Sequence, residues 1–142
     1  MKISKKGIDL IKMFEGCKLT SYQCSAKVWT IGYGHTQGVK QGVTITQLQA
    51  DNYLKADLIQ FENQINSLLL QINQNQFDAL VSLVYNIGFG NLKRSMLVAM
   101  IKTNNRNANI KTEWNKFVFA GGVKLLGLIR RRSAEFALYD TI

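Results

Sequence analysis

The spacing of apolar residues near the start of the chain predicts a short amphipathic helix. Ile8, Ile11 and Phe14 recur at intervals of three residues, so they fall on one face of a helix. Ser4 precedes this segment and is a good N-cap, because its hydroxyl can accept from a free backbone N–H. Gly16 follows it and is a good stop, because glycine readily takes the left-handed conformation found after helix ends. The acidic residue before this glycine therefore ends the helix.

A β-prone region follows this helix. Residues 18–22 and 28–33 are β-prone and are separated by small polar residues, which predicts a hairpin-like pair of strands. A glycine-bounded loop is expected at 38–42. Thr46 and Gln49 stand three residues apart before an apolar run, which is the pattern of a capping box and predicts the start of a second helix.

The middle of the chain predicts two long helices. The first continues from Thr46 to about Leu70, and Asn73 or Asn75 caps the second. Leu83 lies opposite the apolar face of the second helix, so we expect this helix to be buried nearly all round before it ends at the glycine of the sequence NIG. The apolar face consists of Phe77, Leu80, Val81, Val84 and Tyr85.

The C-terminal part predicts three more helices. They cover 92–101, 109–119 and the apolar segment from Leu125 to Leu138. The pair Gly121–Gly122 forms a turn before the last of them.

The order of these elements predicts an α+β fold that is mostly α. With 142 residues, the chain is long enough for a single domain with its own core, spanning 1–142. We expect a small lobe of about 12–60 that contains the hairpin and a larger helical lobe of 61–142, with the N-terminal helix beside them and a long helix between them. A cleft between such lobes is the usual place for a polymer substrate.

The charge of the chain changes the expected partners. A net charge of +9 favours a polyanion, either nucleic acid or the carboxylates and phosphates of a bacterial envelope, although a solvated basic surface also explains it. No nucleic-acid-binding signature accompanies the charge, so we expect no specific nucleic acid partner. Two cysteines and one histidine cannot fill a zinc site without further ligands, and we expect no metal or cofactor.

The N-terminal segment predicts where the protein accumulates. Asp9 and Lys12 interrupt its apolar run, so we expect neither a signal peptide nor a membrane anchor there. No other segment approaches ~18 consecutive apolar residues. The protein is therefore expected in the cytoplasm, with reduced thiols.

The candidate chemistry lies in FEGCKLTSYQCSAKVWTIGYGHT, residues 14–36. Glu15, Cys24 and Thr30 form the pattern E-x8-C-x5-T on neighbouring short elements. An acid, a thiol and a hydroxyl suit hydrolysis of a glycosidic bond, which needs a proton donor on the leaving oxygen and a second group that activates a water.

Within EGxxLxxYxxxxxxxTIGYGHT, this pattern resembles the phage-type lysozymes of glycoside hydrolase family 24, the endolysins of tailed phages. The segment FDALVSLVYNIGFG (77–90) resembles that family's central buried helix, and GLIRRRSAEFALY (127–139) resembles its C-terminal helix. The resemblance spans nearly the whole chain. It implies a lysozyme-like fold and hydrolysis of the β-1,4 bond between N-acetylmuramic acid and N-acetylglucosamine, which lyses the host. Most members carry Asp where this chain has Cys24.

The environment of Glu15 sets two opposing expectations. The C-terminal end of a helix disfavours a carboxylate, which should raise the pKa of Glu15 and keep it protonated as a general acid requires. The resemblance implies a nearby arginine, Arg131 or Arg130, which would lower this pKa. Sequence does not decide between them, and a solvated Glu at a helix end is the ordinary alternative.

Cys24 allows three interpretations. It can orient or deprotonate the attacking water, which gives inversion. As a thiolate it can attack the sugar carbon, which gives a covalent intermediate and retention. It can also be a small buried hydrophobe. Lys18 and Lys27 are near in sequence and could lower its pKa, while a disulfide with Cys17 would remove the thiol.

The resemblance implies roles for further residues. Thr30 would hydrogen-bond the attacking water. We expect Tyr33, Asn86, Gly88 and Arg131 to contact the substrate.

A histidine–aspartate pair completes these expectations. By the same resemblance, His35 would pair with Asp57 in a structural role. Such a pair would raise the pKa of His35, so its stabilisation would be lost as the pH rises through that value.

Alternative functions remain open at this point. A lytic transglycosylase needs one catalytic Glu and no water, and it leaves an anhydro-muramic product. A basic wall- or membrane-binding module would need no catalysis. We expect a monomer that acts on peptidoglycan, with a possible anionic outer-membrane contact through the basic C-terminal helix. A holin that lets it leave the cytoplasm is implied by the resemblance.

Overall fold

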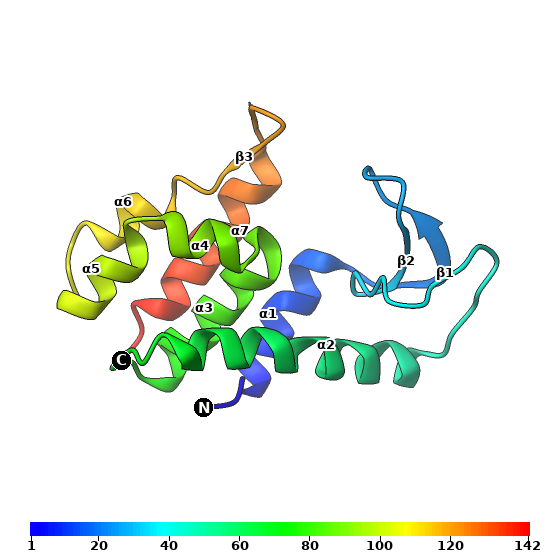
Figure 1. Cartoon of the computed structure of the whole chain (residues 1–142), viewed down its shortest axis with the longest axis horizontal. Coiled ribbons are helices and arrows are strands. Elements are labelled where there is room, and N and C mark those ends of the chain that lie inside the picture. Colours follow the sequence, from blue (N-terminus) through cyan, green and yellow to red (C-terminus); the bar gives the residue numbers. More distant parts are fainter. The chain divides into compact units, whose positions relative to one another are not determined.

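The computed structural model describes all 142 residues, and they pack into two compact units. One unit consists of residues 11–60, and the other combines residues 1–10 with residues 61–142. Two helices contribute to both units, α1 (Lys5–Glu15) and α2 (Gln47–Ser67) (Figure 1). None of the helices is both long and apolar enough to cross a membrane.

The unit of residues 11–60 contains the predicted hairpin. Strands β1 (Lys18–Gln23) and β2 (Trp29–Gly32) pair antiparallel, with an irregularity in β1 between its first residue and Tyr22. Tyr22 is the register partner of Thr30. The core of this unit is apolar, and Gly32 of β2 lies against α2, because an added Cβ there would meet the Ala50 side chain at 3.4 Å. The core comprises Ile11, Ile31, Tyr33, Ile45, Ala50, Leu54 and Leu58.

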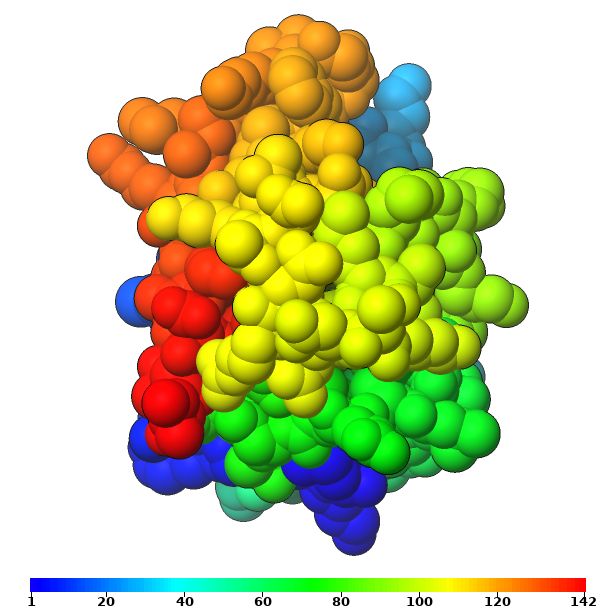
Figure 2. Space-filling model, turned by 90° about the vertical axis from the view of Figure 1, so that its left-hand side faces the viewer, coloured from blue at the N-terminus to red at the C-terminus, as the bar shows by residue number.

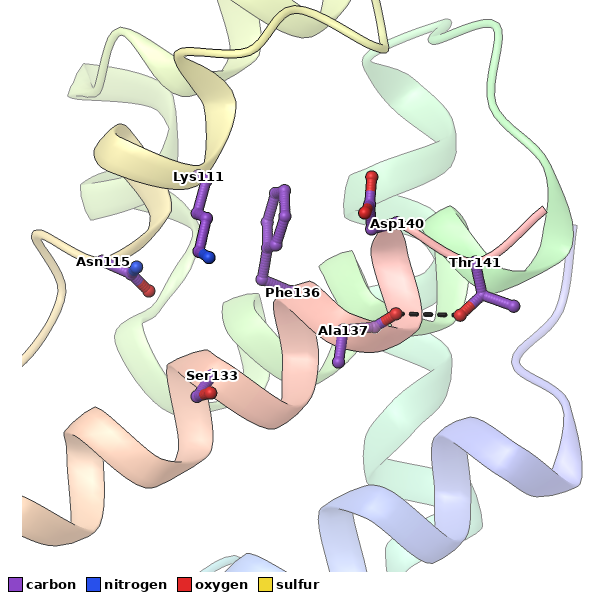
Figure 3. Close-up of a pocket in the computed structure, with 7 residues that line it drawn as sticks. All are labelled: Lys111, Asn115, Ser133, Phe136, Ala137, Asp140 and Thr141. Carbon is purple, nitrogen blue, oxygen red and sulfur yellow. Dashed lines mark hydrogen bonds between the residues drawn. The ribbon is translucent and has the colours of Figure 1, made fainter.

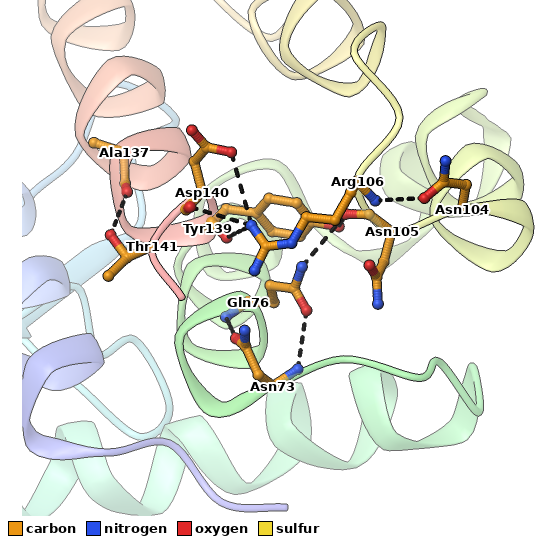
Figure 4. A network of polar contacts seen from close by, with 9 residues as sticks. All are labelled: Asn73, Gln76, Asn104, Asn105, Arg106, Ala137, Tyr139, Asp140 and Thr141. Carbon is orange, nitrogen blue, oxygen red and sulfur yellow. Dashed lines mark hydrogen bonds and ion pairs between the residues drawn. The ribbon is translucent and has the colours of Figure 1, made fainter.

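The predicted capping box at Thr46 and the predicted N-cap at Asn73 are both present, and Asn73 also forms a capping box. At the start of α2, the backbone N–H of Gln49 donates to Thr46 Oγ1 at 3.1 Å, and the backbone N–H of Thr46 donates to Gln49 Oε1 at 2.8 Å. Asn73 and Gln76 exchange the equivalent bonds at the start of α3 (Gln74–Ile87) (Figure 4). The second helix ends at Ser67, three residues earlier than predicted.

The second unit is built around α3. Every residue from Gln76 to Val84 is buried, as the apolar residues on opposite sides of this helix predicted. The C-terminal helix α7 (Leu126–Tyr139) packs along α3. Three short helices complete the unit, α4 (Phe89–Arg94), α5 (Leu97–Thr103) and α6 (Ile110–Trp114). Figure 2 shows α5, α6 and the C-terminal end of α7 on one face.

Three predictions for this unit are wrong in detail. The helix expected at 92–101 is two helices, because the backbone at Ser95 is extended and its hydroxyl donates to Leu92 O. The helix expected at 109–119 ends at Trp114, and the chain then forms a second hairpin, β3 (Phe119–Ala120) with β4 (Val123–Lys124), around the predicted glycine turn.

The third departure concerns the first cap. Ser4 directly precedes α1, but its hydroxyl donates to a carboxylate oxygen of the buried Asp78 instead of accepting from the helix. The backbone N–H of Ser4 also donates to Asp78, at 2.9 Å. A long-range carboxylate therefore anchors this helix start, which is an interaction that local sequence does not reveal.

Candidate active site

The acid of the candidate site lies where the sequence predicted. Glu15 is the last residue of α1 and is half-buried. Gly16 follows with φ +67°, the left-handed conformation that favours glycine. A Cβ at Gly16 would meet no atom within 4 Å, so the turn after Glu15 projects into open space.

The thiol lies in the loop of the first hairpin. Cys24 N–H donates to Val28 O at 3.0 Å, and Lys27 N–H donates to Cys24 O at 2.8 Å, so residues 24–28 form a tight reversal. Hydrogen bonds from the backbone N–H groups of Val28 and Ala26 lower the pKa of Cys24, and a bond from Thr30 acts in the same direction against the opposing effect of burial. The cause is therefore the loop backbone and not the neighbouring lysines that the sequence indicated.

The three predicted catalytic residues come together around one aromatic side chain. Thr30 is buried, and its hydroxyl donates to Val28 O at 2.9 Å within the same loop. Burial raises the pKa of Tyr22, and the negative charges of Cys24 and Glu15 raise it further, so both groups lie within electrostatic reach of its hydroxyl. Sequence reasoning missed Tyr22, although strand alternation places it on the same face as the residue two positions later.

Both cysteines carry free thiols. Cys17 is exposed and Cys24 is partly exposed. A thiolate at Cys24 can accept a proton or attack an electrophilic carbon, because the thiolate is the reactive form. With a carboxyl group as proton donor, the arrangement can perform acid-assisted cleavage of a glycosidic bond.

Tyr33 has a different environment from the one expected of a substrate contact. It is 8% exposed, and its hydroxyl accepts from Gln47 Nε2 at 2.9 Å. The ammonium of Lys12 lies 5.4 Å from its ring centroid. Most of Tyr33 is therefore packed inside the unit.

His35 and Asp57 lie in contact. His35 Nδ1 is 2.8 Å from Asp57 Oδ2 and 3.1 Å from Oδ1, which joins the segment after β2 to α2. The imidazole also stacks on Tyr53, with ring centroids 4.3 Å apart. These contacts suit a structural role.

The other three expected substrate contacts belong to the unit of residues 1–10 and 61–142. Asn86 is exposed at the end of α3, and Gly88 caps that helix with φ +83°. Asn86 lines a cavity of about 350 Å³ together with Asn91, aromatic rings and aliphatic side chains. Arg131 is 3% exposed, and its guanidinium donates to Ser82 O and to Glu135, each at 3.2 Å.

A second cavity in the same unit carries no comparable chemistry. It measures about 380 Å³ and lies between α6 and the C-terminal half of α7 (Figure 3). Its lining combines one ammonium, one carboxylate, one aromatic ring and small polar groups, without a paired acid and nucleophile. The lining residues are Lys111, Asn115, Ser133, Phe136, Ala137, Asp140 and Thr141.

Comparisons with known proteins point to one family. The profile described as "Phage lysozyme" matches residues 12–135. The endolysin of Acyrthosiphon pisum secondary endosymbiont phage 1 is 40% identical over 145 residues, with 99% of each chain covered. The solved muramidase domain of SpmX from Asticaccaulis excentricus superimposes with a TM-score of 0.92 at 35% identity, with 99% of each chain covered.

Relatives of other lengths also match. The endolysin of Bacillus phage PZA is 39% identical over 145 residues, which cover 99% of this chain and 56% of that protein. The chain thus spans nearly all of one curated relative and about half the length of another.

Proposed function

Because this chain belongs to the phage lysozyme family, we propose that Glu15, Cys24 and Thr30 form its catalytic centre. The chain is a glycoside hydrolase of the lysozyme type, an endolysin muramidase that acts on peptidoglycan. The bond cleaved is the β-1,4 bond between N-acetylmuramic acid and N-acetylglucosamine. The observation that carries the residue assignment is geometric: Glu15 ends α1 directly before the first hairpin, and Cys24 and Thr30 share the tight loop of that hairpin, where Thr30 Oγ1 donates to Val28 O at 2.9 Å.

Glu15 serves as the general acid. Its carboxyl proton passes to the glycosidic oxygen as the bond to the anomeric carbon breaks, so the leaving sugar departs with a neutral hydroxyl. The carboxyl group is half-buried at the end of α1, next to the hairpin that carries the other two residues.

Cys24 and Thr30 serve the water that completes the reaction. The Cys24 thiolate accepts one proton from this water while the water oxygen bonds to the anomeric carbon, which leaves Cys24 as a thiol. The thiolate is regenerated when that proton returns through solvent to the Glu15 carboxylate. Thr30 holds the Cys24 side chain in place through the loop that both residues share. This route inverts the anomeric configuration, because water attacks from the face opposite the leaving group.

A covalent route is the alternative for Cys24. Its lowered pKa increases the fraction of thiolate, which is also the form that attacks carbon. Attack by sulfur would form a glycosyl-enzyme thioether and retain configuration after hydrolysis. Cys24→Ser and Cys24→Asp separate the routes. If both variants stay active and release the same anomer as the parent, the covalent route is excluded.

Muropeptide analysis tests the catalytic assignment directly. Purified Gram-negative peptidoglycan is digested with the wild type and with Glu15→Gln, and the released fragments are identified by mass spectrometry. We expect reducing-end muramic acid products from the wild type and a loss of at least ~100-fold in the variant, the size typical of general acid catalysis. Near wild-type release by a folded Glu15→Gln would contradict the role of Glu15. Anhydro-muramic products would assign the chain to the lytic transglycosylases.

Asn86 and Gly88 are proposed to contact the sugar chain. Arg131 was expected to do so, but it is buried, and we propose that it acts through its bonds to Ser82 and Glu135. The exposed amide of Asn86 in a cavity lined by aromatic rings suits an N-acetyl group, which combines an amide with a methyl. Tyr33 is proposed to act mainly through packing, since its hydroxyl is already engaged. Asn86→Ala should raise KM more than it lowers kcat, and unchanged kinetics would exclude the contact.

The remaining proposals concern the surroundings of the enzyme. We propose one catalytic domain acting as a monomer, held in the host cytoplasm until a holin-type partner releases it. The net charge of +9 favours contact with anionic envelope polymers, including an outer membrane. A Glu15→Gln protein that fails to permeabilise Gram-negative cells would exclude an independent membrane activity.

A further inference from the structure

Polar contacts fix the chain on both sides of Glu15. Lys12, three residues before it, places its ammonium 3.1 Å from Asp51 Oδ1. Cys17, two residues after it, donates from its sulfur to Gln47 Oε1 at 3.8 Å. Both partners lie in the first turns of α2, so one short stretch of that helix contacts the chain before and after the acid.

The two contacts belong to one network. Gln47 Nε2 donates to Asp51 Oδ1 at 3.0 Å and to the Tyr33 hydroxyl at 2.9 Å. Hydrogen bonds from Lys12 and then Gln47 lower the pKa of Asp51, so this carboxylate stays charged. We call Lys12, Cys17, Tyr33, Gln47 and Asp51 the helix-end clamp.

The clamp is more than a surface ion pair. The side chains of Lys12 and Asp51 are 30% and 28% exposed, while those of the Lys5–Asp9 pair on the same helix are 88% and 53% exposed. Partial burial reduces screening by water and salt, so the clamp pair holds its geometry better. The Lys12 ammonium also lies against the Tyr33 ring, which adds a cation–π contact.

The turn after Glu15 is open on one side. No side chain fills the space beside Gly16, whose φ of +67° is the left-handed conformation that glycine favours. The clamp supplies contacts on both sides of this glycine, and these contacts help to fix the orientation of the last turn of α1.

We propose that Asp51 and Gln47 are positioning residues for the reaction, and that the helix-end clamp aims the carboxyl group of Glu15 at the glycosidic oxygen. The inference rests on the proposed role of Glu15 as the acid. Misplacement of a catalytic group by about 1 Å can cost roughly 100-fold in rate, so a modest rotation of this helix end would be visible in turnover.

A double-mutant cycle on Lys12 and Asp51 tests the clamp. Initial rates on purified peptidoglycan are measured for Asp51→Asn, Lys12→Met and the double variant. Each single variant should lower kcat by about tenfold with KM changed less than about twofold, because orientation and not binding is lost. The double variant should be no slower than either single variant, since both changes remove the same contact.

Asp9→Asn is the matched control. It makes the same chemical change on the other carboxylate of an α1 lysine–aspartate pair, at an exposed position. Its kcat should stay within about twofold of the wild type. Asp51→Glu keeps the charge and should restore most of the lost kcat, which a general destabilisation of the fold would not explain.

The outcomes separate this inference from the proposed function. Wild-type kcat in folded Asp51→Asn overturns the positioning role, as does an equal loss in Asp9→Asn or a loss that merely follows the folded fraction measured by circular dichroism at the assay temperature. If Glu15→Gln retains activity, the proposed acid is wrong, whatever the clamp variants do. Loss in Glu15→Gln together with the non-additive loss in the clamp variants supports both.

Discussion

Glu135 joins the most buried polar groups of the larger unit, and its replacement by glutamine tests how much this polar cluster contributes to the free energy of unfolding. The residue is fully buried on α7. Its carboxylate accepts from Arg131 Nε at 3.2 Å, from Trp114 Nε1 at 3.3 Å and from Ser82 Oγ at 2.5 Å. Arg132 Nε lies 2.7 Å from its second oxygen. Two buried cations thus share one carboxylate.

The expected cost follows from the charges left behind. Glutamine has the same shape, but it is neutral, and its amide N–H groups face donors. The side chains of Arg131 and Arg132 are 4% and 0% exposed, so water cannot replace the lost anion. Removing one partner of a buried ion pair costs about 3–5 kcal/mol, against a total stability of roughly 5–15 kcal/mol for a domain. For a chain of this length, that loss corresponds to a fall in Tm of roughly 10–15 °C.

Urea unfolding followed by circular dichroism measures the difference. Glu113→Gln is the matched control, because it also converts a paired glutamate to an amide. Its partner Lys116 lies 2.6 Å away but is 62% exposed, so this change should cost less than about 1 kcal/mol. The slope of free energy against urea should stay the same in both variants, which would show that stability alone has changed.

One result would refute the reasoning. If Glu135→Gln loses no more stability than Glu113→Gln, the buried arginines do not depend on this carboxylate for compensation. A large loss in both variants would also contradict it, since burial would then not explain the difference.

Three further variants give distinct outcomes. Cys24→Asp should keep hydrolytic activity to a lower pH than the wild type. A carboxylate with a reference pKa of ~3.9 stays charged at a pH where a thiol, even with its pKa lowered, is protonated. Superimposable pH–rate profiles would contradict a charged role for Cys24. Burial raises the pKa of Tyr139 to about 12, while a tyrosine in the unfolded chain ionises near a pH of about 10. The free energy of unfolding of the wild type should therefore fall by about 2–3 kcal/mol as the pH rises from roughly 10 to 12. Tyr139→Phe removes the hydrogen bond to Asn105 O and should lower the free energy of unfolding by about 1 kcal/mol at neutral pH. The free energy of unfolding of this variant should then fall less than that of the wild type as the pH rises from roughly 10 to 12. Asp57→Asn should lower the free energy of unfolding by about 1–2 kcal/mol by weakening the bond to His35, and an unchanged free energy of unfolding would exclude a stabilising pair.

Local features of the fold could be predicted from sequence. The two capping boxes join residues three positions apart, so their geometry follows from the sequence of one helix turn. The positive φ of Gly16 and the pairing of β1 with β2 were predictable for the same reason. The break at Ser95 was not, because the apolar pattern continues through it and only packing divides the segment.

Long-range contacts explain most of what the sequence missed. Asp51 is 39 positions from Lys12 and Asp78 is 74 positions from Ser4, and no periodicity connects such pairs. The proposed triad could be suggested from sequence because its motif is specific, whereas the proximity of Tyr22 to Glu15 and Cys24 depends on how the hairpin folds back. The lowered pKa of Cys24 has the same origin, since the donors are backbone groups that any sequence possesses.

The loop around Cys24 also allows the enzyme to be titrated through its thiol. Its backbone N–H groups stabilise the thiolate, and the side chain is partly exposed, so an alkylating reagent should reach and modify this sulfur at a pH where an ordinary thiol is still largely protonated. A carboxylate at the same position would be silent to such reagents. Stoichiometric labelling at Cys24, followed by peptide mapping to separate it from Cys17, would therefore give the concentration of competent enzyme in any preparation, one label for each functional molecule.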